Sequence, residues 1–496
     1  MGLVFEFGTG SLDRSAVAML SNPVRISVGP TETLDRPIAS ATLLTPIDVR
    51  HNRDAASDDP AEPIQRSNPS IPPQQPMNRR RFLRTAGVVG AAAASGCATR
   101  LNPLGGTPTP ELTPTPEAPS TRVGTALTGT YPGGPNPDDA IANLRLVTEW
   151  LDRPPAVTLV FVNGLVPDAA KRGFVEGPLT AIWEAGHVPL LTWQPFAREM
   201  QDTSETVERA IAAGEYDGHL SSWATLLESW ARPYGGRTRG RRFYFRPAHE
   251  MNGDWFPWSA VDSSRIDATV TPAPNGSGSP NGTREPNPAA GTPEEYVGMW
   301  RRLYEAFGET ALDGSNVQWV WAVNADEIGG VRAERYYPGD RYVDWVGLDG
   351  FNFGGTQSYS TWRTPAEVFD PMLGRLRDLT DKPVALTEFA SASFVGSEGD
   401  GEYRPPRKAA WIEAAFEYVV ENDIKMTCWF NVDKRGEDEG DWAVFGGERG
   451  TERATVSDGR YSAYPVYNRT VSGERFLGAR TDYPALLTDA EFAGEF

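Results

Sequence analysis

The sequence predicts a (β/α)8 barrel, an α/β fold in which parallel strands alternate with helices. Short apolar runs recur along the chain after residue 123, and amphipathic stretches such as IANLRLVTEWL and YVGMWRRLYEAF separate them. Near-continuous apolar strands are typical of parallel sheets that are buried on both faces. The eight runs cover residues 124–131, 156–163, 187–196, 242–250, 317–324, 343–352, 383–390 and 424–431.

A doubly wound open sheet is the alternative architecture for the same alternation of strands and helices. Nucleotide-binding sheets of that kind carry a glycine-rich phosphate loop after the first strand. No such loop follows residues 124–131. Eight successive strand–helix units therefore favour the closed barrel.

Three segments precede the predicted barrel. Residues 1–76 show little periodicity, which predicts either a disordered extension or an over-extended start. Residues 77–97 read MNRRRFLRTAGVVGAAAASGC, with paired arginines and then a short run of small apolar residues that ends at Cys97. This segment resembles a twin-arginine export signal with a lipoprotein cleavage site. We therefore expect lipidation of Cys97 and an extracellular, surface-tethered protein.

Low-complexity sequence is expected in two further places. Residues 98–122 are rich in Pro and Thr, which predicts an extended linker. Residues 123–496 are expected to form the barrel domain, and the Pro-, Gly- and Asn-rich stretch at about residues 260–292 is expected to form a loop on its rim.

Composition excludes several classes of partner and scaffold. The formal net charge is −19 and the isoelectric point is near 4.8, so nucleic acid is not an expected partner. The chain has only two cysteines, Cys97 and Cys428, which excludes a disulfide framework. The apolar part of the signal is too short to span a bilayer, so we expect contact with a membrane only through the lipid.

Polar and aromatic residues gather where the predicted strands end. Active sites of barrels form at the carboxyl ends of their strands. Counting along the chain, Glu250 ends the fourth strand and Glu388 ends the seventh, so both carboxylates are expected to face one mouth. The candidate residues at these ends are Trp193, Arg246, His249, Glu250, Asn324, Phe351, Glu388 and Trp429, and the same ends also carry Asn163, Gln194, residues 349–352 and residues 429–431.

The stretch RPAHEMNGDWFPW, residues 246–258, indicates a sugar-cleaving acid. A glycosidase needs a carboxyl group that keeps its proton near neutral pH, and aromatic faces that stack on sugar rings. Glu250 lies there beside His249, and we expect His249 and Arg246 to hold the carboxylates by charge-assisted bonds. The expected stacking faces are Trp255, Trp258, Trp321 and Trp429, and Trp193 is expected among the residues that bind substrate.

These residues resemble glycoside hydrolase family 26, the family of many endo-β-1,4-mannanases. The resemblance spans about residues 125–431 and is carried by HEMNGDW around Glu250, YYPGDRYVDWVGLDGFN at 336–352 and TEF around Glu388, with weaker agreement at AAGEYDGHLSSWA. It implies a retaining enzyme with Glu250 as acid/base and Glu388 as nucleophile, and it places His249 and Trp255 beside the bond that is broken.

The chain departs from the commonest family pattern at Phe351, where tyrosine is frequent. A hydroxyl near the nucleophile is thereby lost, which implies either another donor or a different substrate preference. The resemblance implies β-1,4-mannan as the first expectation, with mixed-linkage β-1,3-1,4-glucan or β-1,3-xylan as alternatives on the same site.

A surface protein that binds glycans without cleaving them is the alternative from another class, although the presence of both glutamates argues against it. No metal is expected, because the spacing of Asp340, Asp344 and Asp349 fits no calcium loop. No cofactor is expected, the expected partner is a polysaccharide, and the sequence leaves the oligomeric state open.

Overall fold

The computed structural model describes residues 124–134, 139–198, 200–233, 240–260, 291–328, 330–397, 400–435, 439–457 and 459–496. These residues all fall within one compact unit. The predicted extension 1–76, the export signal 77–97 with Cys97, and the linker 98–122 lie outside the described residues. So does nearly all of the predicted loop at 260–292.

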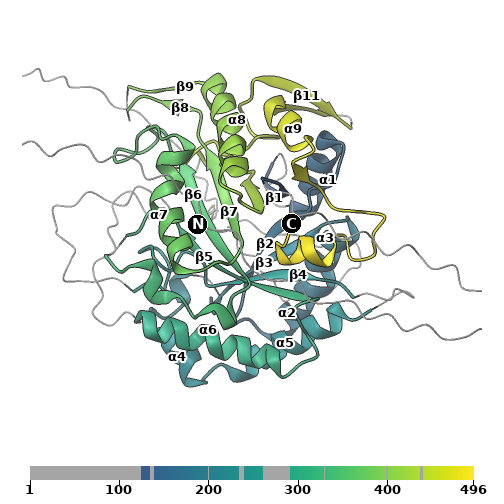
Figure 1. Ribbon diagram of the computed structural model, residues 1–496, viewed down its shortest axis with the longest axis vertical. Helices are drawn as coiled ribbons and strands as arrows, with labels where there is room; N and C mark the ends of the chain where they lie inside the picture. Colours follow the sequence, from purple (N-terminus) through teal and green to yellow (C-terminus); the bar gives the residue numbers. More distant parts are fainter. Residues whose placement is uncertain are drawn as a thin grey trace, which may run out of the picture. The chain divides into compact units, whose positions relative to one another are not determined.

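Eight parallel strands close into a barrel, as predicted (Figure 1). Each strand pairs with the next along the chain, and β10 pairs in parallel with β1, so the sheet has no gap between its last and first barrel strands. This closure confirms the barrel and shows that the open-sheet alternative is wrong. The strands are β1 (Ala126–Tyr131), β2 (Val157–Asn163), β3 (Val188–Gln194), β4 (Phe243–Pro247), β5 (Val317–Asn324), β6 (Trp345–Asn352), β7 (Val384–Ser391) and β10 (Met426–Phe430).

Burial on both faces explains the apolar composition of these strands. In the eight barrel strands every residue is buried except Phe351, which is half-buried. The inner side chains fill the barrel, and the outer side chains pack against the helices. A buried polar residue in such a strand needs a hydrogen-bond partner, so polar residues here point to specific polar contacts inside the barrel.

Helices cover the outside of the barrel, and capping motifs in the sequence mark where two of them begin. Thr292 and Thr364 each cap a helix in a capping box with the glutamate three residues later, and a proline follows each of them. The helices are α1 (Ala140–Leu151), α2 (Asp168–Phe174), η1 (Val175–Leu179), α3 (Thr180–Glu184), η2 (Met200–Asp202), α4 (Val207–Ala213), α5 (Asp217–Ala231), α6 (Pro293–Gly308), η3 (Ala333–Tyr336), η4 (Asp340–Tyr342), α7 (Pro365–Leu379), α8 (Pro405–Glu421), α9 (Pro465–Val471) and α10 (Asp489–Ala493). Among the described helices, none combines the length and apolar content needed to cross a membrane.

Short strands decorate the barrel. The pairs β8 (Phe394–Val395) with β9 (Glu402–Tyr403) and β11 (Glu452–Val456) with β12 (Gly459–Ala463) are antiparallel. The strand β13 (Phe476–Leu477) runs parallel to the first residues of β1. The segment after α8 therefore belongs to the barrel domain.

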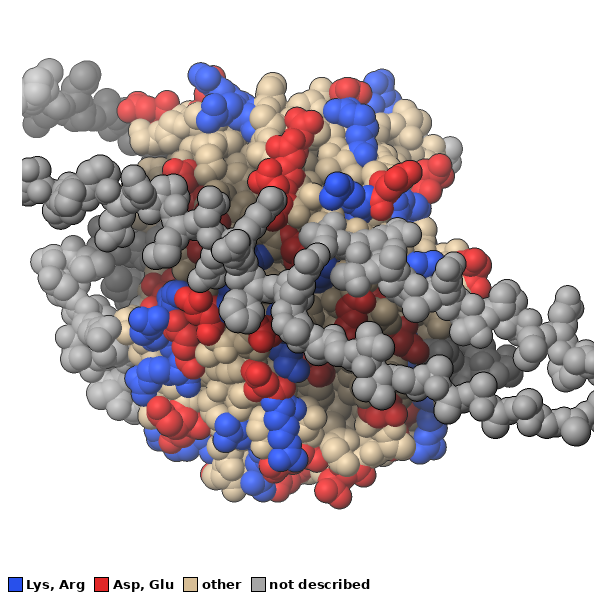
Figure 2. Space-filling view, viewed as in Figure 1, with Lys and Arg blue, Asp and Glu red and all other residues tan. Residues whose placement is uncertain are grey.

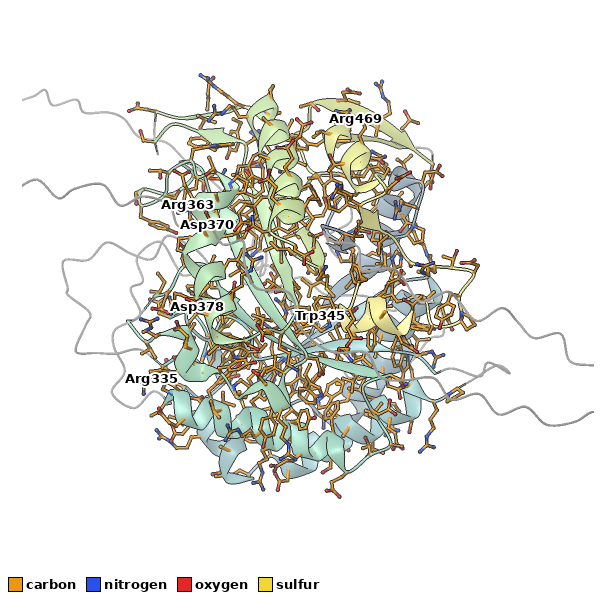
Figure 3. All side chains as sticks on the ribbon, viewed as in Figure 1. Arg335, Trp345, Arg363, Asp370, Asp378 and Arg469 are labelled. Carbon is orange, nitrogen blue, oxygen red and sulfur yellow. The ribbon has the colours of Figure 1, made fainter. Side chains whose placement is uncertain are left out.

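The C-terminal segment packs over the amino ends of the barrel strands. The ring of Phe492 in α10 lies 4.8 Å from the ring of Tyr244, and the Arg242 guanidinium lies 4.7 Å from the Phe492 ring. Trp345, labelled in Figure 3, donates its indole N–H to the Phe492 carbonyl at 3.2 Å. Phe492 is thus a main anchor of this segment, at the end of the barrel opposite the polar mouth.

Replacing Phe492 by alanine is expected to lower the free energy of unfolding by about 3–5 kcal/mol, because a buried aromatic ring is lost from a packed site. Urea unfolding measures this loss. The exposed Glu495→Ala is the control and should unfold like wild type, and equal stability of Phe492→Ala and wild type would contradict this role.

The lysines are few and mostly internal. Only five of the 47 basic residues are lysines, and four of these five are buried: Lys171, Lys408, Lys425 and Lys434. Lys408 donates its ammonium hydrogens to the backbone carbonyls of Asp441 and Ala443. On the face in Figure 2, basic side chains lie interspersed among acidic ones. Nearly all of the positive charge on the described surface therefore comes from arginine.

Candidate active site

The turn after β4 has a strained backbone that the surrounding structure fixes. Ala248 and Glu250 have φ angles of 45° and 54°, in the left-handed region that residues with a Cβ rarely adopt. The Ala248 amide donates to the Trp193 carbonyl at 2.9 Å, and the Glu250 amide donates to the Ala322 carbonyl at 3.0 Å. The Tyr296 hydroxyl donates to the Ala248 carbonyl at 3.0 Å. These bonds to β3, β5 and α6 hold the Glu250 side chain at the mouth.

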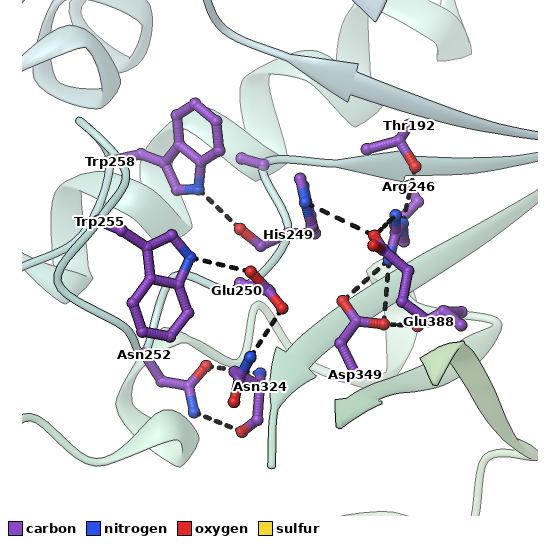
Figure 4. Close-up of polar contacts among 12 residues, drawn as sticks. Thr192, Arg246, His249, Glu250, Asn252, Trp255, Trp258, Asn324, Asp349 and Glu388 are labelled. Atoms are coloured by element: carbon purple, nitrogen blue, oxygen red, sulfur yellow. Dashed lines mark hydrogen bonds and ion pairs between the residues drawn. The ribbon is translucent and has the colours of Figure 1, made fainter. Parts of the chain in front are cut away.

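Glu250 is buried among neutral hydrogen-bond donors (Figure 4). The Asn324 amide donates to Glu250 Oε1 at 2.7 Å, and the Trp255 indole donates to Oε2 at 2.9 Å. Burial raises the pKa of Glu250 to about 7, the charge on Glu388 acts in the same direction, and the two hydrogen bonds oppose the shift. This carboxyl group can therefore hold a proton near neutral pH.

Asn324 is itself held in place. The Asn252 side-chain oxygen accepts from the backbone N–H of Asn324, and the Asn252 side-chain NH₂ donates to the backbone carbonyl of Asn324, both at 2.8 Å. This pair of bonds ties the turn after β4 to the end of β5. The donor that contacts Glu250 is thus pre-organised.

Glu388 is paired with a buried arginine. Arg246 Nη2 donates to Glu388 Oε1, and Arg246 Nη1 lies 3.1 and 2.9 Å from the two carboxylate oxygens of Asp349. The third direction of the guanidinium is taken by Thr192 Oγ1, which accepts from Nε at 2.8 Å. Charge-assisted bonds on three sides fix the guanidinium and, through it, the Glu388 carboxylate.

Asp349 shares the same cation. Its side chain is fully buried, and Thr387 donates a hydroxyl hydrogen to its Oδ1. Burial raises the pKa of Asp349, and the Arg246 guanidinium opposes that rise. One arginine thus stands between two buried carboxyl groups, which makes it the main positive charge of the site.

His249 acts here as a neutral residue. Its Nε2 lies 3.7 Å from Glu388 Oε1, which is too long for a hydrogen bond. Burial lowers the pKa of His249 well below its ordinary value, and the Arg246 cation acts in the same direction. The expectation of a charge-assisted bond from His249 is therefore wrong, whereas the expected bond from Arg246 to Glu388 is confirmed; within the described part of the chain, Arg246 alone supplies such a bond.

The structure removes several of the expected stacking faces from the surface. Trp193, Trp258 and Trp429 are fully buried. Because alternate residues of a strand face opposite sides, Trp193 points away from the barrel interior that the adjacent Thr192 faces. Trp258 stacks on Phe256 at 4.4 Å between ring centroids. Trp321 is fully buried as well. The expectation that Trp258, Trp321 and Trp429 offer open faces to sugars is therefore wrong, and burial also leaves Trp193 without an open face for substrate.

Trp429 illustrates the physical reason. It lies between the barrel and its outer layer, 4.9 Å from the Phe389 ring, and its indole N–H donates to the Trp442 carbonyl at 2.9 Å. Its neighbour Phe430 instead contacts Tyr131 of β1 and Phe351 of β6 across the barrel. The alternation along β10 therefore gives the inner position to Phe430.

Phe351 and Trp255 remain at the mouth. Phe351 is half-buried at the end of β6, with Trp442 at 5.2 Å between ring centroids. Trp255 is 8% exposed, and its N–H is committed to Glu250. The predicted residues that the structure brings together are thus Arg246, His249, Glu250, Asn324, Trp255, Phe351 and Glu388.

Asp349, Thr192 and Asn252 support the site but were not predicted as site residues. Asp349 was expected among the polar residues at the strand ends and was weighed as a metal ligand with Asp340 and Asp344, but no role beside Glu388 was predicted for it. The structure separates these three: Asp340 accepts from Tyr337 and Thr380, and Asp344 accepts from the Trp319 amide. No group of metal-ligating side chains occurs within the described ranges. The sequence signal that could have predicted a role for Asp349 is its position inside the otherwise apolar strand β6.

Surface hollows lie away from these carboxylates. One of about 730 Å³ is lined by residues such as Asp344, Lys382 and Lys425, near the amino ends of the strands. Another of about 440 Å³ lies between α1 and α3, beside Glu149 and His187. Neither gathers groups with matched acid and base chemistry, so the mouth remains the candidate site.

Comparison with known proteins supports the same region. The model of Glycosyl hydrolase family 26 matches residues 242–375, which include Arg246, Glu250 and Asp349. Endoglucanase H of Acetivibrio thermocellus is 29% identical over 268 residues, covering 53% of this chain and 23% of that protein. Mannan endo-1,4-beta-mannosidase A and B of Caldalkalibacillus mannanilyticus is 31% identical over 134 residues, covering 26% of this chain and 20% of that protein.

A solved modular endo-beta-1,4-mannanase from Cellulomonas fimi aligns with 21% identity and a TM-score of 0.47, covering 75% of this chain and 74% of that chain. The chain spans less than a quarter of the length of the two curated relatives above. Over the matched residues, the chain is similar to glycoside hydrolases.

Proposed function

We propose that this protein is a retaining endo-acting β-glycanase in which Glu250 is the acid/base and Glu388 the nucleophile. One observation carries the proposal: two buried glutamates at one mouth have opposite partners. Among the described residues, Glu250 accepts from the neutral groups Asn324 and Trp255 and has a raised pKa, whereas Glu388 is paired with the Arg246 cation. Two carboxyl groups in such different environments suit an acid and a nucleophile.

In the first step, a Glu388 carboxylate oxygen attacks the anomeric carbon of the bound sugar. The bond from that carbon to the leaving oxygen breaks, and the Glu250 proton moves to the leaving oxygen. An ester between the sugar and Glu388 results. Arg246 stays bonded to the carboxylate, which fixes the angle of attack.

In the second step, the roles of the two groups change. The negative charge of Glu388 disappears when the ester forms, which removes one cause of the raised Glu250 pKa. Glu250, now ionised, takes a proton from water while the water oxygen attacks the anomeric carbon. The ester bond breaks, and the Glu388 carboxylate and the protonated Glu250 return.

For the substrate we propose β-1,4-mannan, with mixed-linkage β-1,3-1,4-glucan or β-1,3-xylan as alternatives. The similarity to mannosidases supports mannan, and the similarity to an endoglucanase supports glucan. Reducing-sugar release from glucomannan, galactomannan, barley β-glucan, lichenan and β-1,3-xylan tests the choice. Proton NMR of the first product tests retention, because a retaining enzyme releases the β anomer before mutarotation. Release of the α anomer would contradict the mechanism.

A glycan-binding protein without turnover is the competing function. The donors that hold Glu250 and Glu388 in two different environments favour an enzyme, because sugar binding alone does not need an acid and a nucleophile. If no polysaccharide is cleaved, and Glu250→Gln and Glu388→Gln bind polysaccharide as wild type does, the protein is a glycan-binding protein instead.

The pH dependence follows from the Glu250 pKa. The acid must be protonated in the free enzyme, so kcat/KM should fall as pH rises above about 7. The Trp255 N–H favours the ionised form, so Trp255→Phe should raise the pKa of Glu250 and move this limb to higher pH. The control is Trp258→Phe, because the Trp258 N–H donates at 2.8 Å to the His249 carbonyl and not to a carboxylate. A limb that stays in place in Trp255→Phe would contradict this assignment.

We also propose that the protein is exported through the twin-arginine route and tethered outside the cell by lipidated Cys97. The sequence of residues 77–97 supports this. Mass spectrometry of the membrane fraction should find Cys97 as a modified first residue, and Cys97→Ala should release the protein from that fraction. An unmodified chain that begins at Met1 would overturn the proposal.

A further inference from the structure

Gln194 at the carboxyl end of β3 is a buried amide with unused hydrogen-bonding capacity. It is fully buried, and neither its Oε1 nor its Nε2 has a partner among the described residues. Leaving such a group unpaired in a protein interior is costly. A buried and unpaired amide at the mouth of a barrel therefore indicates a site for a ligand.

The direction of the side chain follows from the strand. Thr192, two residues earlier in β3, faces the barrel interior, because its hydroxyl accepts from Arg246 Nε. Gln194 faces the same side and lies about 6.6 Å further toward the mouth. Arg246 in turn holds Glu388. Gln194 is therefore one layer above the Thr192–Arg246–Glu388 chain, at the level of a sugar that Glu388 attacks.

Other polar atoms without a described partner lie on the adjacent strand β2 and just after β4. Asn163 of β2 is the direct neighbour of Gln194 in the sheet, and its Oδ1 has no described partner, although its Nδ2 donates to the Arg198 carbonyl. After β4, His249 Nδ1 is also buried without a described partner. Phe161, two residues before Asn163, lies 5.8 Å from the His249 ring, which places β2 beside this histidine.

A strand-end amide that only supports the fold looks different. Asn431, just after β10, accepts at Oδ1 from the amides of Val444 and Phe445 and donates at Nδ2 to the Phe445 carbonyl. The Asn431 side chain therefore uses its hydrogen bonds to hold a loop. The Gln194 side chain makes no hydrogen bond to the described residues.

The chemistry of these groups selects the ligand. Gln194 supplies an uncharged donor and an acceptor, Asn163 supplies an acceptor, and neutral His249 supplies a ring nitrogen. Hydroxyl groups, which donate and accept together, match this set. A phosphate or carboxylate would meet mainly acceptors.

We propose that Gln194, with Asn163 beside it, binds hydroxyl groups of the sugar unit that Glu388 attacks and so determines which sugar configuration is cleaved. This inference rests on the proposed glycanase function and deepens it. It names a specificity-determining residue that forms part of neither carboxylate's hydrogen-bond network.

The test compares Gln194→Met with Gln318→Met. Gln318 is a buried glutamine near the start of β5, at the other end of the barrel, whose Nε2 donates to the Gly314 carbonyl at 2.8 Å. The substrates are 2,4-dinitrophenyl β-glycosides of mannobiose and cellobiose, and versions that lack the 2-, 3- or 6-hydroxyl on the attacked sugar. We expect kcat/KM to fall about 10- to 100-fold in Gln194→Met and to stay within about twofold in Gln318→Met.

Deoxygenated substrates identify the contact. Wild type should lose activity on the version that lacks the bound hydroxyl, and Gln194→Met should show no further loss on it. Equal kcat/KM for Gln194→Met and wild type on all substrates would overturn the proposal, as would losses that add for every hydroxyl. Gln194→Ala replaces Gln194→Met if unfolding shows that the latter does not fold.

The two proposals fail in different ways. If wild type cleaves no glycoside, the glycanase function fails. If wild type cleaves and Glu388→Ala does not, but Gln194→Met equals wild type, only the inference about Gln194 fails.

Discussion

Glu388→Ala is expected to lower kcat on the cleaved polysaccharide on the order of 10⁴-fold or more, because the covalent route disappears with the attacking oxygen. Glu250→Ala should lose about 10²- to 10⁴-fold, since only proton transfer is removed. On 2,4-dinitrophenyl glycosides, whose leaving group needs no proton, Glu250→Ala should recover its first step and Glu388→Ala should not. Stopped-flow release of dinitrophenolate measures this difference.

Sodium azide gives each variant a distinct product. In Glu388→Ala, azide can occupy the space of the missing carboxylate and attack from the face opposite the leaving group, which yields an α-glycosyl azide. In Glu250→Ala, azide attacks the ester on Glu388 from the other face and yields a β-glycosyl azide. NMR of the products assigns the two roles. The reverse pattern would mean that the acid/base and the nucleophile are exchanged.

Arg246→Met is expected to cause the largest combined loss of stability and activity. The change leaves the buried carboxyl groups of Asp349 and Glu388 without their cation. Breaking a buried ion pair from one side costs about 3–5 kcal/mol of unfolding free energy. Loss of the fixed Glu388 geometry should also lower kcat/KM by about 100-fold or more. Urea unfolding and steady-state kinetics measure the two effects.

A matched control lies just before the same strand. Arg242 is also buried, but its guanidinium bonds Asp489 and the carbonyls of Leu487 and Thr488 at the far end of the barrel. Arg242→Met should lose stability and keep kcat. The double variant Arg246→Met with Asp349→Leu should regain part of the stability and none of the activity. Full activity in Arg246→Met would show that Glu388 is positioned by other groups.

Most of the barrel could be predicted from the sequence, because each strand is buried on both faces and appears as a short apolar run. The predicted run 317–324 coincides with β5, and 156–163 differs from β2 by one residue. The predicted and observed bounds differ most at β4, because the run 242–250 continues past Pro247 into the turn that carries Glu250. The left-handed backbone of that turn depends on bonds from distant segments, which no local pattern shows.

The sequence predicts the two candidate carboxylates and Arg246 as a charged partner, which bonds Glu388, but not the contacts of Arg246 with Thr192 and Asp349. Glu250 stands in a distinctive local motif, but the contact between Arg246 and Asp349 joins β4 to β6 across the barrel interior. The direction in which an indole points depends on strand alternation, and a one-residue error exchanges the two faces. Trp429 was therefore mistaken for a sugar-facing residue.

The internal position of the lysines has a practical consequence for handling the protein. Reagents that acylate amines will find few targets on the described surface, where Lys382 alone among the five lysines is not buried. Attachment to a resin and cross-linking for mass spectrometry should therefore use carboxyl-directed chemistry. A protease that cuts only after lysine should leave the folded barrel intact under conditions in which an arginine-specific protease nicks its surface.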